Sequence, residues 1–94
     1  MSKTERIRFT TLSEDEVKKI NYATLSVRGR ELISGVHLEH YSDGKVIAGF
    51  ALFSGNSIHD HNAHVIGKAI CKLYPEVNEV WHNAHKVYAP IGNN

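Results

Sequence analysis

Cysteine is nearly absent from this 94-residue chain, which contains only Cys71. A single thiol excludes an internal disulfide and a zinc site built from paired cysteines, and it suits a reducing compartment. No apolar run approaches the roughly 18–20 residues that a membrane helix needs. The first residues also lack the apolar stretch of a secretory signal. These absences predict a cytoplasmic protein that does not act in a membrane.

An excess of charge of one sign is also missing. The chain has 11 Lys and Arg against 10 Asp and Glu, which leaves a net charge of +1 at pH 7. No overall field therefore steers the protein toward nucleic acid, so we do not expect that partner. The arginines are confined to the N-terminal third: Arg6, Arg8, Arg28 and Arg30. One small patch for phosphate or for acidic side chains is one interpretation of them, and solvated charges on an edge strand are the favoured alternative. On a strand, Arg6 and Arg8 would point to the same side.

The best-marked boundary in the sequence is a helix start at Ser13. Ser13 and Glu16 have the spacing of a capping box, followed by an amphipathic segment. We expect a strand over residues 5–12 before this helix. The helix should end near residues 21–24, with Gly29 in a turn.

The middle of the chain predicts a β-hairpin. Residues 32–41 and 46–53 flank Asp43-Gly44, a dipeptide typical of two-residue type I′ turns. That loop length would place His37 opposite Phe50.

Residues 46–53 are apolar on both faces, which suits either a central strand covered on both sides or a strand with helices on one face and a subunit contact on the other. Gly49 within it would let a neighbouring side chain approach closely. Together with the aromatic residues Phe50, Phe53, Tyr74 and Trp81, this strand predicts a homo-oligomer.

Two further helices are expected after the hairpin. The first covers residues 58–74, with Ser57 and Asp60 as a weak capping box and Gly67 marking close packing on the sheet. Pro75 would end it and begin a third helix. Apolar residues recur there at helical spacing: Val77, Val80, Trp81 and Ala84.

The loop between the hairpin and the helix at 58–74 is the first candidate site. Unpaired backbone N–H groups and the helix dipole make such junctions suitable for anions. Side chains there and along the helix would add donors and charge: Ser54, Asn56, Ser57, His61 and Lys68. Neither GxxxxGK[ST] nor GxGxxG is present, and an ordinary capped connection is the alternative interpretation.

Histidines give a second candidate, a site for zinc or another divalent metal. Asp60, His61 and His64 combine a carboxylate with two imidazoles, and His82 and His85 repeat the spacing of the imidazole pair. A small metal-dependent hydrolase is conceivable on these residues. Solvated polar helix faces are the alternative, and without the metal no cofactor is expected.

Catalysis has less support than binding. Cys71 would lie in mid-helix, where nothing lowers the pKa of its thiol, and a buried small apolar role is the usual one. The sequence leaves open whether the chain is an enzyme and favours that it is not.

The segment Ala48-Gly-Phe-Ala-Leu-Phe-Ser, followed by Asp60 and by Gly67-Lys-Ala-Ile, resembles small phage-encoded accessory proteins. Some of these are of the anti-Thoeris sponge type, oligomeric proteins that sequester cyclic nucleotide signals of host defence without cleaving them. This chain departs from the pattern after Lys68, where a further basic residue would be expected. The resemblance implies a phage or mobile-element origin, action in the host cytoplasm and a non-enzymatic, anti-defence role.

Together these features predict one α+β domain over residues 1–94. We expect a small antiparallel sheet of three to four strands, with two to three helices packed mainly on one face. The leading functional hypothesis is stoichiometric capture of a nucleotide-like ligand or inhibition of a host protein. The alternatives are the metal site or hydrolase, and a purely structural interaction module.

Overall fold

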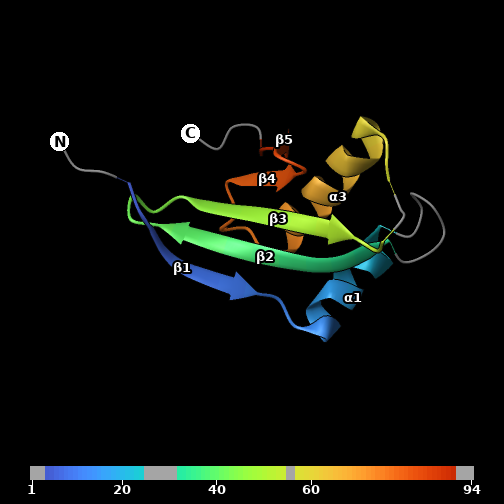
Figure 1. Cartoon of the computed structure of the whole chain (residues 1–94), viewed down its shortest axis with the longest axis horizontal. Coiled ribbons are helices and arrows are strands. Elements are labelled where there is room, and N and C mark those ends of the chain that lie inside the picture. Colours follow the sequence, from blue (N-terminus) through green and yellow to red (C-terminus); the bar gives the residue numbers. More distant parts are fainter. Residues whose placement is uncertain (1–3, 25–31, 55–56, 91–94) are drawn as a thin grey trace.

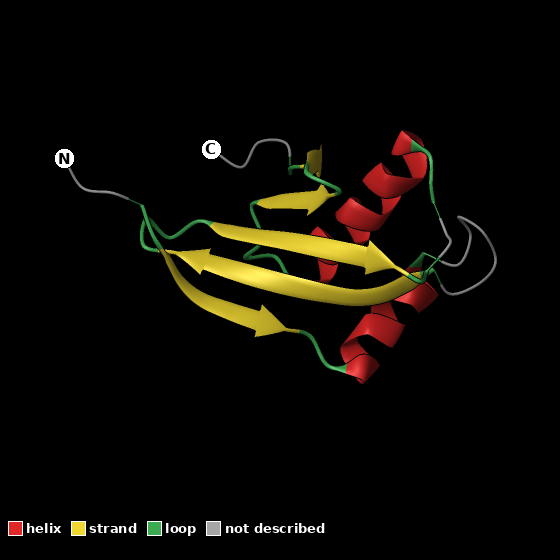
Figure 2. Ribbon diagram, viewed as in Figure 1, coloured by secondary structure: helices red, strands yellow, loops and turns green. Residues whose placement is uncertain are grey.

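The computed structural model describes residues 4–24, 32–54 and 57–90, which form one β-sheet layered against helices (Figure 1). In chain order the elements are β1 (Arg6–Thr11), α1 (Glu14–Ala23), β2 (Ile33–Tyr41), β3 (Val46–Leu52), α3 (Asp60–Leu73), β4 (Glu79–His82) and β5 (His85–Tyr88). Both helices lie behind the same face of the sheet, as Figure 2 shows. The α+β class and the packing of the helices on one face are confirmed.

The sheet is larger than expected and it is mixed. Five strands follow the order β1-β2-β3-β4-β5, and all neighbours are antiparallel except β3 and β4, which are parallel. The sheet thus has one strand more than the predicted three to four, and it departs from the predicted antiparallel arrangement only at the β3–β4 pair. The parallel pair arises because α3 crosses from the end of β3 back to the start of β4, as a β-α-β connection requires.

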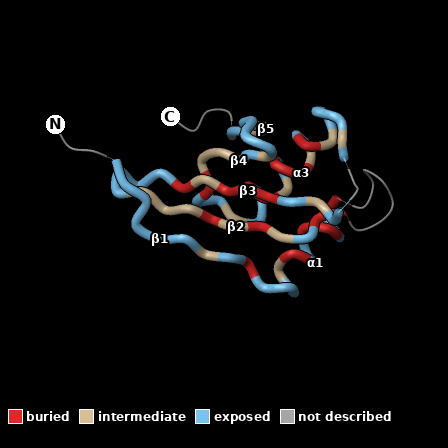
Figure 3. The backbone as a smooth tube through the Cα atoms, viewed as in Figure 1, coloured by how far each residue is buried: buried red, intermediate tan, exposed pale blue. Residues whose placement is uncertain are grey.

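The core lies between the helices and the middle strands (Figure 3). Leu38 and Ala48 pair across β2 and β3 on the helix side, and both are buried. Ile66 and Ile70 from α3 are at most 1% exposed. Burying such apolar side chains supplies most of the free energy that favours folding.

The first helix begins as the sequence predicts. The Ser13 hydroxyl accepts a hydrogen bond from the Glu16 backbone N–H, and the Glu16 carboxylate accepts one from the Ser13 N–H. The helix ends at Ala23, within the expected range, whereas Gly29 falls outside the described residues. Near its end, the buried side chain of Asn21 bonds both the N–H and the carbonyl of Ile33 and so fixes the start of β2.

The hairpin of β2 and β3 forms, but its register is one residue away from the prediction. Tyr41 donates its N–H to the carbonyl of Lys45, so the loop has three residues and not two. Gly44 in this loop has φ +89°, the left-handed conformation that a three-residue hairpin loop places in its bulge. The consequence is that His37 lies opposite Gly49 instead of Phe50.

The expected third helix is wrong, because the chain there forms β4 and β5. Val80 is fully buried while its neighbour Trp81 is 37% exposed, which is the alternation of a strand. The spacing of apolar residues imitated a helix over a segment that pairs with β3. Asn83 and Ala84 have φ 50° and 64°, as in a type I′ turn, and so His82 lies opposite His85 across a hairpin.

Helix α3 starts at Asp60 with His59 as its N-cap, so the expected Ser57–Asp60 capping box is wrong. Gly67 does mark close packing, as predicted. A β-carbon built on Gly67 would lie 2.6 Å from Cβ of Tyr88, so α3 rests directly on β5. Within the described ranges, neither helix has the length and apolar character needed to cross a membrane.

Candidate functional site

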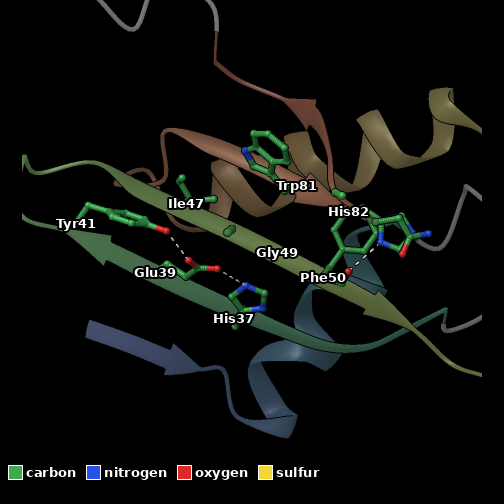
Figure 4. A pocket seen from close by; sticks show the side chains of 11 residues that line it. His37, Glu39, Tyr41, Ile47, Gly49, Phe50, Trp81 and His82 are labelled. Carbon is green, nitrogen blue, oxygen red and sulfur yellow. Dashed lines mark hydrogen bonds and ion pairs between the residues drawn. The ribbon is translucent and has the colours of Figure 1, made fainter. Parts of the chain in front are cut away.

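The sheet face opposite the helices carries a hollow of about 390 Å³, which we call the open-face hollow (Figure 4). Within the described residues no helix covers this face. β2 and β4 form its two sides, β3 forms its floor, and the β4–β5 turn closes one end. The lining residues are His37, Glu39, Tyr41, Ile47, Ala48, Gly49, Phe50, Trp81, His82, Asn83 and Ala84.

The β2 side of the hollow is a polar wall centred on Glu39. Tyr41 donates its hydroxyl to Oε1 of Glu39 at 2.6 Å, and Nε2 of His37 lies 2.9 Å from Oε2. Arg6 from β1 places Nη1 3.7 Å from Oε1. The Tyr41 hydrogen bond, supported by His37 and Arg6, lowers the pKa of Glu39 despite its partial burial. Glu39 is therefore an ionised acceptor at neutral pH.

His37 is held in place from two further directions. Its ring stacks on the ring of Phe9, with centroids 4.9 Å apart and an interplanar angle of 16°. The guanidinium of Arg6 also lies over the Phe9 ring, with Cζ 5.1 Å from the ring centroid. Toward β3, the imidazole leans over Gly49, where a β-carbon would lie 2.7 Å from Nε2. The close approach that the sequence predicted at Gly49 is confirmed, and His37 is the residue that uses it.

The β4 side of the hollow is an aromatic wall formed by Trp81. The indole Nε1–H donates to Oε1 of Glu79 at 2.9 Å, and Nζ of Lys45 lies 2.7 Å from the other carboxylate oxygen. Lys45 is the main cause of the lowered pKa of Glu79, and the Trp81 bond and the more distant Lys86 add to it. The hydrogen bond of the indole N–H thus fixes the orientation of the Trp81 ring, which remains partly exposed to solvent.

Phe50 and His82, which line the end of the hollow, form a second stacked pair. The rings of Phe50 and His82 are 4.4 Å apart at an interplanar angle of 4°, and Nδ1 of His82 lies 2.9 Å from the Phe50 carbonyl oxygen. His82 is therefore engaged with β3 and does not join the imidazole cluster on α3.

The structure separates the predicted arginine patch. A bulge in β1 places Arg6 opposite Tyr41 and Arg8 opposite His40, which are consecutive residues on opposite faces of β2. Arg6 thus lies on the side of Glu39, whereas Arg8 contacts Nε2 of His40 at 3.1 Å. The prediction that Arg6 and Arg8 share a side is wrong. Arg28 and Arg30 lie outside the described residues.

The predicted residues at the strand–helix junction are only partly brought together. Ser54 follows β3, Ser57 precedes α3 and His61 lies in its first turn, while Asn56 is outside the described ranges. Lys68 lies further along α3 and lines a different groove.

The predicted metal residues Asp60, His61 and His64 do line one cleft, of about 580 Å³, together with His85 from β5. Among the residues that the structure describes, no group of three or more His, Cys, Asp or Glu side chains is placed to hold a metal ion. The ring of His64 instead packs edge-to-face with that of Tyr88, with centroids 4.9 Å apart and an interplanar angle of 72°.

Cys71 is buried, as expected, and burial raises the pKa of its thiol. Its Sγ lies 3.8 Å from the carbonyl oxygen of Val77, inside the core. This environment is that of a packing residue and not of a reactive thiol.

No motif in the sequence marks His37, Glu39, Tyr41 and Trp81 as a site. One signal was available, since residues 37, 39 and 41 alternate along a strand and so share one face. The position of Trp81 was hidden by its assignment to a helix.

Comparison with family models, with curated proteins and with solved structures finds no significant match to this chain.

Proposed function

We propose that this chain is a non-enzymatic binding protein that captures a nucleotide-like ligand in the open-face hollow. The observation that carries the proposal is that an aromatic wall on β4 and a polar wall on β2 face each other across β3. The Trp81 ring stands on one side of Gly49, and the bonded set of His37, Glu39 and Tyr41 stands on the other. Convergent polar groups beside apolar surface are typical of small-molecule sites.

The aromatic wall suits a planar base. Stacking of a base on an aromatic side chain contributes about 1–3 kcal/mol, and it works with any base because each has a π face. Trp81 is 37% exposed, and its indole N–H is already bonded to Glu79, so its orientation is set before a ligand arrives. A preset ring loses little freedom on binding.

The polar wall suits the edge of such a base. The ionised Glu39 carboxylate accepts bonds from Tyr41 and His37 and has lone pairs that remain for the amino group of a ligand. Lys86 is the β5 residue paired with Trp81, but it lines the cleft beside α3 and not the open-face hollow, so the proposal assigns it no contact with the ligand.

A binding role without catalysis agrees with the protonation of Tyr41 in the polar wall. The hydrogen bond to Glu39 raises the pKa of Tyr41, which opposes a role as base or nucleophile. The resemblance to phage accessory proteins points the same way, toward stoichiometric capture of a signal in the cytoplasm of a host. The metal-dependent alternative has no comparable arrangement in the described residues.

The chain offers a direct test because Trp81 is its only tryptophan. Adenosine monophosphate should quench the intrinsic fluorescence in a saturable manner, whereas ribose 5-phosphate, which lacks the base, should not. By calorimetry, Trp81→Ala should weaken binding about tenfold or more, as loss of one stacking contact implies. Tyr22→Ala, which removes an aromatic ring that is 79% exposed on α1, is the matched control. Equal quenching by ribose 5-phosphate, or no calorimetric binding of nucleotides, would overturn the proposal.

A further inference from the structure

The outer side of the helix layer carries a second concave surface, which we call the helix groove. It has a volume of about 360 Å³ and is formed by Ala23 at the end of α1 and by one side of α3: Val65, Lys68, Ala69, Lys72 and Leu73. The core-facing side of α3 consists of other residues, such as Ile66 and Ile70. The helix groove is therefore turned away from the sheet and from the open-face hollow.

The helix groove has an apolar floor. Ala23, Val65 and Ala69 contribute small or branched side chains, and Leu73 is 44% exposed at its end. A large aliphatic side chain in contact with water at a concave surface is unfavourable, and covering it would be favourable. Small residues at the centre leave space for one apolar side chain from outside.

The rim of the helix groove is positively charged. Lys68 and Lys72 are four residues apart on α3, so they are neighbours on one helix face, where like charges oppose each other. The ion pairs among the described residues involve Arg6, His37 and Lys45 but neither of these lysines. The fold thus places two adjacent ammonium groups beside an apolar groove, and no carboxylate of the described residues forms an ion pair with either of them.

We propose that the helix groove docks an acidic, amphipathic peptide segment of a partner protein. An apolar side chain of the segment lies on Ala69 and Leu73, and its carboxylates pair with Lys68 and Lys72. This arrangement is the usual one for an amphipathic helix bound in a groove, with charge complementarity that sets its position. The proposal does not rest on nucleotide capture, because the two surfaces share no residue.

The concave shape of the helix groove favours an acidic peptide over other anionic partners. A phosphate backbone satisfies the lysines but leaves the floor of Val65, Ala69 and Leu73 wet. A lipid surface is flat on this scale, and it would favour an exposed convex helix face over a groove. An acidic peptide satisfies both parts of the surface at once.

The test uses the full chain and a fluorescein-labelled amphipathic peptide of Glu and Leu, about twelve residues long, measured by fluorescence anisotropy. Wild type should bind it saturably, and Lys68→Glu/Lys72→Glu should weaken binding at least about tenfold, since each attraction becomes a repulsion. The matched control is Lys18→Glu, an exposed lysine on α1 that lies outside the helix groove and should change the Kd less than twofold.

Each other outcome counts against the proposal. It is overturned if the labelled peptide does not bind, if a Lys-Leu peptide binds equally well, or if Lys18→Glu weakens binding as much as the double variant. Binding to phosphatidylserine vesicles without binding to the peptide would replace the partner by a membrane.

The variant Lys68→Gln/Lys72→Gln, which removes charge without reversing it, should lose an amount of peptide affinity between that of wild type and that of the Glu variant. Quenching of Trp81 by adenosine monophosphate should be unchanged in all lysine variants, so failure of one proposal is distinguishable from failure of the other.

Discussion

The imidazole of His37 occupies the space that a side chain at Gly49 would take, so that a β-carbon at Gly49 would lie 2.7 Å from Nε2 of His37. The two residues are direct partners across β2 and β3. This contact lets His37 lie flat over the sheet, where it also reaches Phe9 and Glu39. One missing side chain therefore determines the shape of the polar wall.

Gly49→Ala should disrupt the open-face hollow more than it disrupts the fold. The new methyl group displaces the end of the His37 side chain, which then loses its stacking on Phe9 and its bond to Glu39. We expect a loss of about 1 kcal/mol in the free energy of unfolding, measured with urea. Nucleotide binding should weaken in parallel.

Gly35→Ala is the matched control, because a β-carbon there meets no atom within 4 Å. It lies on β2 and should leave the stability within about 0.5 kcal/mol of wild type. If Gly49→Ala were equally neutral and the His37 ring signals were unchanged in NMR spectra, the assigned contact would be wrong.

Ala84→Gly should stabilise the protein. Ala84 has φ 64°, a left-handed conformation that disfavours residues with a β-carbon, and it occupies the turn position where glycine is preferred. Removing the strain should raise the free energy of unfolding by about 0.5–1 kcal/mol. Gly44→Ala, at φ +89°, should do the reverse by a similar amount in the same denaturation experiment. A destabilising effect of Ala84→Gly would contradict the β4–β5 turn.

Gly67→Ala should destabilise the protein although alanine favours helices. Helix propensity alone predicts a gain of about 1 kcal/mol. The added methyl group would, however, lie 2.6 Å from Cβ of Tyr88, an atom that side-chain rotation does not move. Overpacking should dominate, with a net loss of about 1–3 kcal/mol by thermal or urea unfolding. A net gain would mean that α3 is not seated on β5 as described.

Glu39 should make stability depend on acid pH. Its folded pKa lies below the ordinary value of 4.5, chiefly because Tyr41 donates a hydrogen bond to it. The stabilisation is therefore complete above the unfolded pKa and is lost as the pH falls through the folded pKa. Between pH 6 and pH 3, wild type should lose more unfolding free energy than Glu39→Gln, and Tyr41→Phe should lie between them. Identical acid profiles for wild type and Glu39→Gln would show that the network contributes nothing.

The sequence predicted those parts of the fold that depend on neighbouring residues. The capping box of Ser13 and Glu16, and the close packing at Gly67, were readable because each rests on local chemistry or on one unusual residue. The register of the hairpin was wrong by one residue because Asp43-Gly44 suits more than one loop length. That single step decides whether His37 meets Gly49 or Phe50.

The candidate site depended on what the sequence did not predict. β4 pairs with β3 across a long connection, and an isolated segment carrying Val77, Val80 and Trp81 at helical spacing gives no sign of such a partner. With this segment assigned to a helix, Trp81 had no place beside Glu39. The predicted junction and metal residues remain hypotheses about other parts of the surface.

The most direct test of the proposed function follows the indole N–H of Trp81 in a ¹H–¹⁵N correlation spectrum during titration with adenosine monophosphate. The chain has one tryptophan, so this signal is unambiguous. Capture in the open-face hollow predicts a saturable shift of the Trp81 signal together with those of His37 and Gly49, and little change around Lys68. An indole signal that stays in place at saturating nucleotide, or shifts confined to other surfaces, would contradict the account.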